Sequence, residues 1–172
     1  EKKALHFYER DCSIQRRFQK IIEESPAPKI EQSIINEMAE SAVNFVTNQK
    51  YEGAGTIEYI YDIDNKKFYF LEMNTRIQVE HPVTETVTNF DLVAMQIKFA
   101  LNMDIASIEQ SKINKLGHAI ECRLYAEDPT KNFLPSPGKI TKLKIPNTSL
   151  HNIRLDIGVD EGDEISFYYD PM

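Results

Sequence analysis

Polar side chains occupy every second position in one stretch of the chain, FYFLEMNTRIQVEHPVTE at residues 68–85. The polar positions are Glu72, Asn74, Arg76, Gln78 and Glu80. Side chains alternate faces along an extended chain, so this spacing predicts one stripe of charged and hydrogen-bonding groups. Such a stripe could bind a charged ligand, and a solvated face is the alternative.

The hairpin expected around these residues brings a second carboxylate into reach. The stretch TIEYIYDIDNKKFYFLEMN predicts strands at 56–62 and 67–74 with a turn at Asp64 and Asn65. The register that follows pairs Phe68 with Asp62, Phe70 with Ile60, and Glu72 with Glu58. One face then carries Glu58, Ile60, Phe70 and Glu72, and the other carries Tyr59, Tyr61, Tyr69 and Leu71. Both faces are substantially apolar, and we expect both to be covered.

Two opposed carboxylates repel each other across a sheet unless something neutralises them. A hard divalent cation such as Mg²⁺ takes oxygen ligands and is commonly held by one or two carboxylates together with substrate phosphates. Asn74 would add a neutral oxygen on the same face as Glu58 and Glu72. A solvated position for both acids, or a register that differs by one residue, stays open as the alternative.

The elements that must position these groups predict an α+β fold with an antiparallel sheet and at least two covering helices. Apolar residues at helical spacing predict a helix over 31–48 and a second one over 88–102, with Thr88 and Asp91 as a capping-box pair. Alternating patterns predict further strands at 5–9, 18–24, 118–126, 139–145 and 152–157.

The composition of the chain indicates which kinds of partner and which environment to expect. The net charge of −7 disfavours nucleic acid or an anionic membrane, and no apolar run reaches the ~18 residues of a membrane span. Cys12 and Cys122 lack metal-site spacing, so we expect both to be small core residues in a reduced, cytoplasmic protein. The chain starts at Glu1 without a methionine and stops within a β-rich aromatic run, and we expect an excised segment of a longer protein.

A metal held by Glu58 and Glu72 would predict a phosphate nearby, yet the sequence contains no GxxxxGK[ST] loop. The only GxG is Gly53-Ala54-Gly55, which is too short to cradle a nucleotide. Phosphates would have to be held by the metal and by cations such as Arg76 and Lys20.

Four segments together resemble the biotin carboxylase component of biotin-dependent acyl-CoA carboxylases, an ATP-grasp ligase. They are EMNTRIQVEHPVTE, ERDCSIQRRFQKIIEESPAP, GHAIECRLYAEDP and FLPSPGKI. The similarity runs from about residue 5 to the last residue, and it implies the C-terminal part of an ATP-grasp fold. Residues 1–116 would be its catalytic portion, and 117–172 a truncated biotin carboxylase C-terminal portion.

The resemblance also implies roles for single residues in the ATP- and bicarbonate-dependent carboxylation of biotin through carboxyphosphate. Mg²⁺ or Mn²⁺ ions bridging the ATP phosphates would be bound by Glu58, Glu72 and Asn74. Bicarbonate would be held by Arg76, Lys20, Gln78 and the backbone of Val79. Glu80 would remove the bicarbonate proton, Arg123 would stabilise the biotin enolate, and Gln15 would contact the nucleotide.

The partners that the resemblance implies are a biotin carboxyl carrier protein and a carboxyltransferase, and it allows for a homodimer. Phe18 departs from the family, whose members commonly have His or another polar residue there, so a ribose hydrogen bond is lost. The family's N-terminal domain and glycine-rich lid are absent from these 172 residues, and we expect little or no activity from them alone.

Alternatives stay open for single residues and for the chain as a whole. Lys20, Arg16 and Arg17 could form an exposed basic strand, Arg123 could pair with Glu121 or Glu127, and His81 could shape the turn before Pro82. The chain could belong to another ATP-grasp ligase such as a carbamoyl phosphate synthetase relative, whose looser E-x-N-x-R pattern lacks the QVEHPVTE continuation. It could also be a non-catalytic assembly module with the polar stripe as its binding surface.

Overall fold

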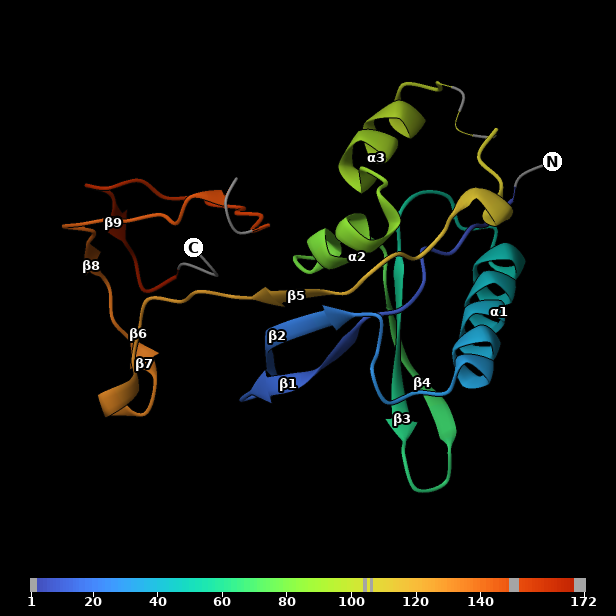
Figure 1. Ribbon diagram of the computed structural model, residues 1–172, viewed down its shortest axis with the longest axis horizontal. Helices are drawn as coiled ribbons and strands as arrows, with labels where there is room; N and C mark the ends of the chain where they lie inside the picture. Colours follow the sequence, from blue (N-terminus) through green and yellow to red (C-terminus); the bar gives the residue numbers. More distant parts are fainter. Residues whose placement is uncertain (1–2, 104, 106, 149–151, 169–172) are drawn as a thin grey trace. The chain divides into compact units, whose positions relative to one another are not determined.

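A computed structural model describes residues 3–103, 105, 107–148 and 152–168 of the chain (Figure 1). The chain divides into two compact units, Glu1–Glu121 and Cys122–Met172, and each is described by itself. The described residues contain small antiparallel sheets and three α-helices, so the predicted α+β class is confirmed.

A three-stranded sheet in the first unit has the order β1-β2-β5, formed by β1 (Asp11–Arg16), β2 (Gln19–Ser25) and β5 (Ala119–Cys122). Arg17 and Phe18 join β1 to β2 as a two-residue turn with φ values of 52° and 64°. Two successive positive φ angles are typical of the type I′ turn, whose twist matches that of the flanking strands. The expected strand at 18–24 is confirmed within one residue. The expected strand at 5–9 is wrong, because this tight turn pairs β2 with the residues directly before it.

The second hairpin consists of β3 (Thr56–Asp62) and β4 (Lys67–Asn74), with the predicted bounds. Glu72 lies opposite Glu58 as expected, but Phe70 pairs with Tyr59 and Phe68 with Tyr61. The predicted partners Ile60 and Asp62 are therefore wrong, because a β-bulge between Phe70 and Glu72 shifts the register.

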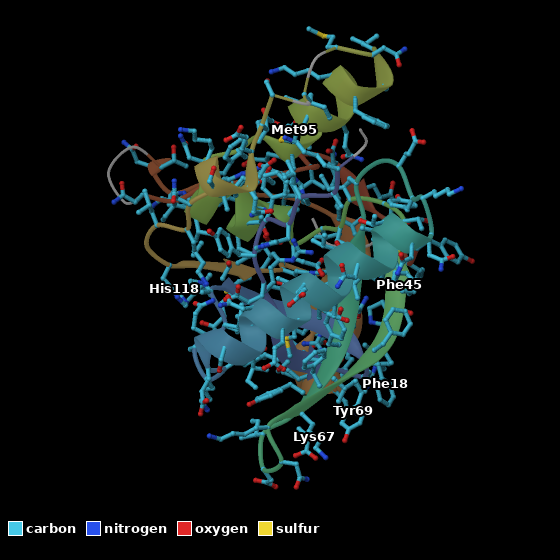
Figure 2. All side chains as sticks on the ribbon, turned by 90° about the vertical axis from the view of Figure 1, so that its right-hand side faces the viewer. Phe18, Phe45, Lys67, Tyr69, Met95 and His118 are labelled. Atoms are coloured by element: carbon cyan, nitrogen blue, oxygen red, sulfur yellow. The ribbon has the colours of Figure 1, made fainter. Side chains whose placement is uncertain are left out.

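The bulge separates an aromatic face from an acidic face. Phe70 packs against Phe45 of α1 (Gln32–Asn48) with ring centroids 5.4 Å apart, and the Tyr59 hydroxyl donates to the Met38 carbonyl oxygen. Figure 1 shows α1 beside the hairpin of β3 and β4, and Figure 2 shows Phe45 on this helix. The predicted helix over 31–48 is thus confirmed, and it contacts the aromatic face, where Phe70 is still 53% exposed. Tyr69 and Ile60, on the other face, are more than half exposed, so the expected cover on both faces is not present among the described residues.

Two short helices follow β4. α2 (His81–Thr88) begins with Pro82 in its first turn and was not predicted. α3 (Leu92–Ala100) begins one turn later than expected, because the Asp91 side chain itself accepts the Ala94 N–H and sets the start of the helix there. The capping-box pair is therefore wrong, since Asp91 is the N-cap and Thr88 belongs to α2.

The second unit contains only two-residue strands in its described part. β6 (Glu127–Asp128) pairs with β7 (Leu134–Pro135), and β8 (Gly138–Lys139) pairs with β9 (Glu164–Ile165). Two 3₁₀ turns complete the described elements, Gln110–Lys112 in the first unit and Pro129–Lys131 in the second.

The long strands expected in this part of the chain are wrong. The expected strand at 118–126 shortens to β5, and 152–157 contains no strand. The expected strand at 139–145 ends at Lys139; Ile140 still exchanges backbone hydrogen bonds with Gly162 and Asp163, and further on the Leu143 N–H donates to the Glu161 side chain. Among the described residues, no helix has the length and apolarity needed to cross a membrane.

Candidate active site

The hairpin brings Glu58 and Glu72 to the same side. Asn74 Nδ2 donates to Glu58 Oε1 at 3.2 Å and to Glu72 Oε1 at 2.9 Å, so one amide links both carboxylates. Glu58 is partly buried and Glu72 is exposed. The two acids are therefore held together with one of them open to solvent.

Glu58, Glu72, Asn74 and Glu80 are called the acidic cluster below, and Lys20, on β2, places a cation in it. Its Nζ donates to Glu58 Oε1 at 2.8 Å and to Glu80 Oε1 at 2.7 Å, and its side chain is only 17% exposed. Burial alone would lower the pKa of Lys20, but the hydrogen bonds to Glu58 and Glu80 outweigh it and hold the pKa above its ordinary value. An exposed basic strand is therefore the wrong description of Lys20.

Glu80 is buried at the end of the loop that follows β4, directly before α2. Burial would raise its pKa, yet the Lys20 hydrogen bond, a backbone hydrogen bond and the nearby positive charges of Lys20 and Arg10 hold the pKa below its ordinary value. The loop is closed by His81, whose backbone N–H donates to the Gln78 carbonyl oxygen at 3.1 Å and whose Nδ1 lies 2.9 Å from the same oxygen. His81 shapes this turn, as one of the alternatives expected.

The Cys12 thiol lies beside the buried carboxylate, with Sγ 3.9 Å from Glu80 Oε1. Burial and the negative charge of Glu80 raise the pKa of Cys12 to about 12. A thiol with so high a pKa is a poor nucleophile at neutral pH. Cys122, in contrast, is exposed, so the expectation of a core position is wrong for that residue.

Gln78 connects the acids to a residue that the sequence did not single out. Its Nε2 donates to Glu58 Oε1 at 2.7 Å, and its Oε1 accepts from Arg10 Nη2 at 3.0 Å. Arg10 stands between two acids in "ERDC", which is typical of a solvated surface residue, and its partners lie 46 to 74 residues away. Nothing in the local sequence could have revealed it.

Four further predicted site residues have different surroundings. Arg76 is exposed and donates to the neighbouring Ile77 carbonyl oxygen at 3.0 Å. Gln15 is exposed, pairs with Lys20 in the β1–β2 register and donates to the Cys12 carbonyl oxygen. Val79 is 43% exposed in the loop before α2. Arg123 belongs to the second unit, where it follows β5 and is half-buried.

Two family models cover most of the chain. The model described as carbamoyl-phosphate synthase L chain, ATP binding domain, matches residues 1–108, and the biotin carboxylase C-terminal domain matches residues 121–172. The chain belongs to the biotin carboxylase family. The second match separates it from carbamoyl phosphate synthetases, which were the other ATP-grasp candidates.

Individual relatives agree with this family. Biotin carboxylase 1 of Bacillus subtilis is 51% identical over 169 residues, which are 98% of this chain and 37% of that protein. The mitochondrial methylcrotonoyl-CoA carboxylase subunit alpha of Mus musculus is 49% identical over 98% of this chain and 23% of its own length.

A solved structure is similar as well, with a TM-score of 0.85 at 40% identity, over 96% of this chain and 36% of that one. It is the biotin carboxylase domain dimer of Hydrogenobacter thermophilus 2-oxoglutarate carboxylase in complex with MgADP, ADP and bicarbonate. This chain therefore spans about a quarter to two fifths of the length of these relatives.

The donor set of this chain suits a hard cation that also binds phosphate. Glu58 and Glu72 provide carboxylate oxygens, and the Asn74 carboxamide could present Oδ1 in place of Nδ2 after a half-turn. No group of three or more His, Cys, Asp or Glu side chains in the described part of the chain forms a complete metal cage. Two carboxylates with further ligands from a substrate are the usual arrangement for Mg²⁺, so the residues present fit that ion.

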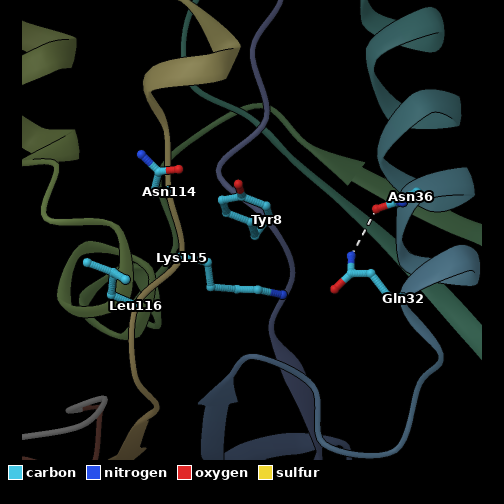
Figure 3. A pocket seen from close by; sticks show the side chains of 6 residues that line it. All are labelled: Tyr8, Gln32, Asn36, Asn114, Lys115 and Leu116. Atoms are coloured by element: carbon cyan, nitrogen blue, oxygen red, sulfur yellow. Dashed lines mark hydrogen bonds between the residues drawn. The ribbon is translucent and has the colours of Figure 1, made fainter.

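A separate hollow of about 650 Å³ lies on the first unit (Figure 3). Its lining consists of Tyr8, Gln32, Asn36, Asn114, Lys115 and Leu116. Lys115 Nζ pairs with Glu9 at 3.0 Å and lies 5.0 Å from the centre of the Tyr8 ring, so its charge is already engaged. None of these lining residues belongs to the acidic cluster.

Proposed function

We propose that this chain forms part of a biotin carboxylase that uses ATP and bicarbonate to carboxylate biotin on a carrier protein. The observation that carries the proposal is the ammonium of Lys20, held between the buried carboxylate of Glu80 and the carboxylate of Glu58. Glu72 faces Glu58 across the hairpin. A fixed cation beside a candidate base and a candidate metal site is what phosphoryl transfer to bicarbonate requires.

Glu80 is the proposed base for the bicarbonate proton. Its pKa lies below the ordinary value, with burial opposing the shift and the Lys20 hydrogen bond driving it, so the carboxylate is ionised and able to accept a proton at neutral pH. A bicarbonate ion that draws the Lys20 ammonium toward itself would weaken that hydrogen bond and raise the pKa of Glu80. Binding of the substrate would therefore strengthen the base next to it.

Lys20, Arg76, Gln78 and the backbone of Val79 form the proposed bicarbonate site. Lys20 and Gln78 already surround Glu58 Oε1, at 2.8 Å and 2.7 Å. Arg76 is exposed on the same loop and would turn from the Ile77 carbonyl oxygen to the anion. A planar guanidinium offers two parallel donors, which match the two oxygens of a carboxylate-like anion.

Glu58, Glu72 and Asn74 are the proposed ligands of Mg²⁺ or Mn²⁺. Such an ion, when bound with ATP, would neutralise charge on the phosphates. The part of this chain is to hold the two carboxylates on one face and to keep Glu72 open to solvent. Gln15 stands beside Lys20 in the sheet register and is the proposed contact to the nucleotide.

The later steps of the proposal involve biotin. Carboxyphosphate would break down to CO₂ and phosphate, the phosphate would take the ureido proton, and Arg123 would stabilise the resulting enolate with its permanent charge. The proposed partners are a biotin carboxyl carrier protein and a carboxyltransferase, with a homodimer as a further proposal. Residues 1–116 and 117–172 remain the proposed domain limits, and a cytoplasmic location is proposed, although the Mus musculus relative is named as mitochondrial.

The replacement Glu80→Gln in the complete polypeptide tests the base. The amide keeps the shape of the side chain but cannot accept the proton, so bicarbonate-dependent ATP hydrolysis should fall by about 100-fold or more. Glu37→Gln, on the exposed side of α1, is the matched control and should leave the rate unchanged.

Turnover by Glu80→Gln near the wild-type rate would contradict the proposed role. Turnover that does not respond to free biotin would instead indicate a different ATP-grasp ligase. Loss of binding to partner proteins with intact turnover would favour the assembly module.

A further inference from the structure

The guanidinium of Arg10 joins three elements around the candidate active site. Nη1 donates to Thr84 Oγ1 in α2 at 2.9 Å, and Nη2 donates to Thr56 Oγ1 at the start of β3 at 3.2 Å. Nη2 also donates to Gln78 Oε1 in the loop after β4 at 3.0 Å. Thr84 and Gln78 are buried, so the guanidinium satisfies their oxygens where water has little access.

This contact decides which way the Gln78 amide points. A guanidinium has only donors, whereas a carboxamide has an acceptor on one side and a donor on the other. With Oε1 facing Arg10, Nε2 faces Glu58 and donates to its Oε1 at 2.7 Å. In the reversed orientation, the Gln78 Nε2 donor would face the Arg10 donors, and Gln78 Oε1 would face the Glu58 carboxylate oxygen. Buried polar groups would then be left without hydrogen bonds.

We propose that Arg10 is a positioning residue for the bicarbonate site, acting through Gln78. Arg10 fixes the orientation of the amide, and the amide fixes the Glu58 oxygen that also receives Lys20. The inference rests on the proposed function, because its kinetic consequence requires bicarbonate turnover. It adds a residue that contacts neither ATP nor bicarbonate in the proposed mechanism.

The variant Arg10→Lys, made in the complete polypeptide, tests the proposal because it keeps the charge and removes the planar fork. We expect the KM for bicarbonate to rise about tenfold or more, because even a small displacement of a positioned side chain such as Gln78 strongly weakens a binding site. The KM for ATP should rise less than the KM for bicarbonate, because Gln78 is itself a proposed bicarbonate contact, whereas Arg10 reaches the proposed metal ligand Glu58 only through the Gln78 amide. Arg154→Lys is the matched control, since it removes a guanidinium fork from an exposed pair with Asp156.

A double-mutant cycle separates positioning from general structural support. Gln78→Ala should raise the bicarbonate KM by itself, and adding Arg10→Lys to it should change that KM little further, because the amide to be oriented is gone. In nitrogen-15 glutamine-labelled enzyme, the side-chain NH₂ signal of Gln78, assigned by its loss in Gln78→Ala, should shift in Arg10→Lys. Changes that multiply in the double variant, or an unmoved signal, would overturn the proposal.

Thr84→Val provides a second route if Arg10→Lys does not fold. It removes one acceptor of Arg10 with little change in shape and leaves Gln78 and Glu58 in place, so a smaller rise in the bicarbonate KM is expected. An active wild-type enzyme with unchanged bicarbonate KM in Arg10→Lys and Thr84→Val would overturn the role of Arg10 alone. A wild-type polypeptide without bicarbonate-dependent turnover would overturn the proposed function, and the inference with it.

Discussion

Replacing Lys20 with methionine removes the ammonium and keeps most of the length of the side chain. Nζ lies 2.7 Å from Glu80 Oε1, and the Glu80 side chain is only 3% exposed. Removing one partner of a buried ion pair costs on the order of 3–5 kcal/mol of stability when the other partner stays charged. Glu80 can instead become neutral by taking up a proton, so the free energy of that protonation sets an upper limit on the loss of stability.

That limit depends on pH in a known way. The ordinary pKa of a glutamate is 4.5, so neutralising Glu80 at about pH 7 costs about 1.4 kcal/mol per pH unit above that value, or about 3.4 kcal/mol. At about pH 5.5 the same limit is about 1.4 kcal/mol. We expect Lys20→Met to lower the free energy of unfolding by about 2–3 kcal/mol at the higher pH and by about 1 kcal/mol at the lower one.

The sign follows from the direction of each pKa shift. In the wild type, Glu80 has a lowered folded pKa despite burial, because of Lys20, so its contribution is present above its ordinary pKa and is lost as the pH falls through the folded one. Lys20 has a raised folded pKa despite burial, because of Glu58 and Glu80, so its contribution is present below its ordinary pKa and is lost only as the pH rises through the folded one. The methionine variant leaves Glu80 buried with less positive charge nearby. A lower pH then protonates Glu80 more readily and reduces the loss of stability.

Urea unfolding of the 172-residue chain, followed by circular dichroism at both pH values, measures this difference. Lys66→Met is the control, because Lys66 and its partner Glu31 are both more than half exposed, and no resolvable change in midpoint is expected at either pH. An equal loss for Lys20→Met at the two pH values would refute the argument, as would no loss at neutral pH.

Three further outcomes are expected. Glu72→Gln should weaken Mn²⁺ binding in the presence of ATP by about tenfold or more, measured by electron paramagnetic resonance, because one of two carboxylate ligands is lost; unchanged binding would exclude Glu72 as a ligand. Asp91→Ala should cost about 1 kcal/mol in urea unfolding, because the Ala94 N–H loses its acceptor at 2.7 Å, and Asp91→Asn should restore most of it. With iodoacetamide near pH 8, Cys122 should react first and Cys12 hardly at all, because burial raises the pKa of Cys12 to about 12; mass spectrometry that finds Cys12 alkylated first would contradict this.

Local patterns were sufficient for α1 and for the second hairpin, but they missed β1 and α2. The helix over 31–48 and both strands of the second hairpin have the bounds that periodicity and turn residues predict. Glu58 also faces Glu72 as expected, although the register differs along the rest of the hairpin. In the second unit the alternating pattern at 139–145 was present, but a strand also needs a partner along its length, and backbone pairing with residues 162–165 reaches only Ile140.

The site shows the same division between local and distant information. The acids and amides of the polar stripe could be found from their spacing, and the family resemblance supplied roles for them. The ion pairs of Lys20 and the fork of Arg10 join residues 38 to 74 positions apart, so no local window contains them. Their positions became visible only when the sheet, the loop and α2 were seen together.

The bulge in the second hairpin has a consequence for which deletions this chain can tolerate. Phe68, Phe70, Glu72 and Asn74 all stand at even positions of one strand. Phe70 nevertheless packs against Phe45 of α1 and Phe68 against Tyr59, whereas Glu72 and Asn74 belong to the acidic cluster. The surplus residue, Leu71, reverses the side that even positions face halfway along the strand. Deletion of the Leu71 codon should therefore be tolerated, because Glu58 would stay opposite Glu72 and Tyr59 opposite Phe70 in a ladder without the bulge.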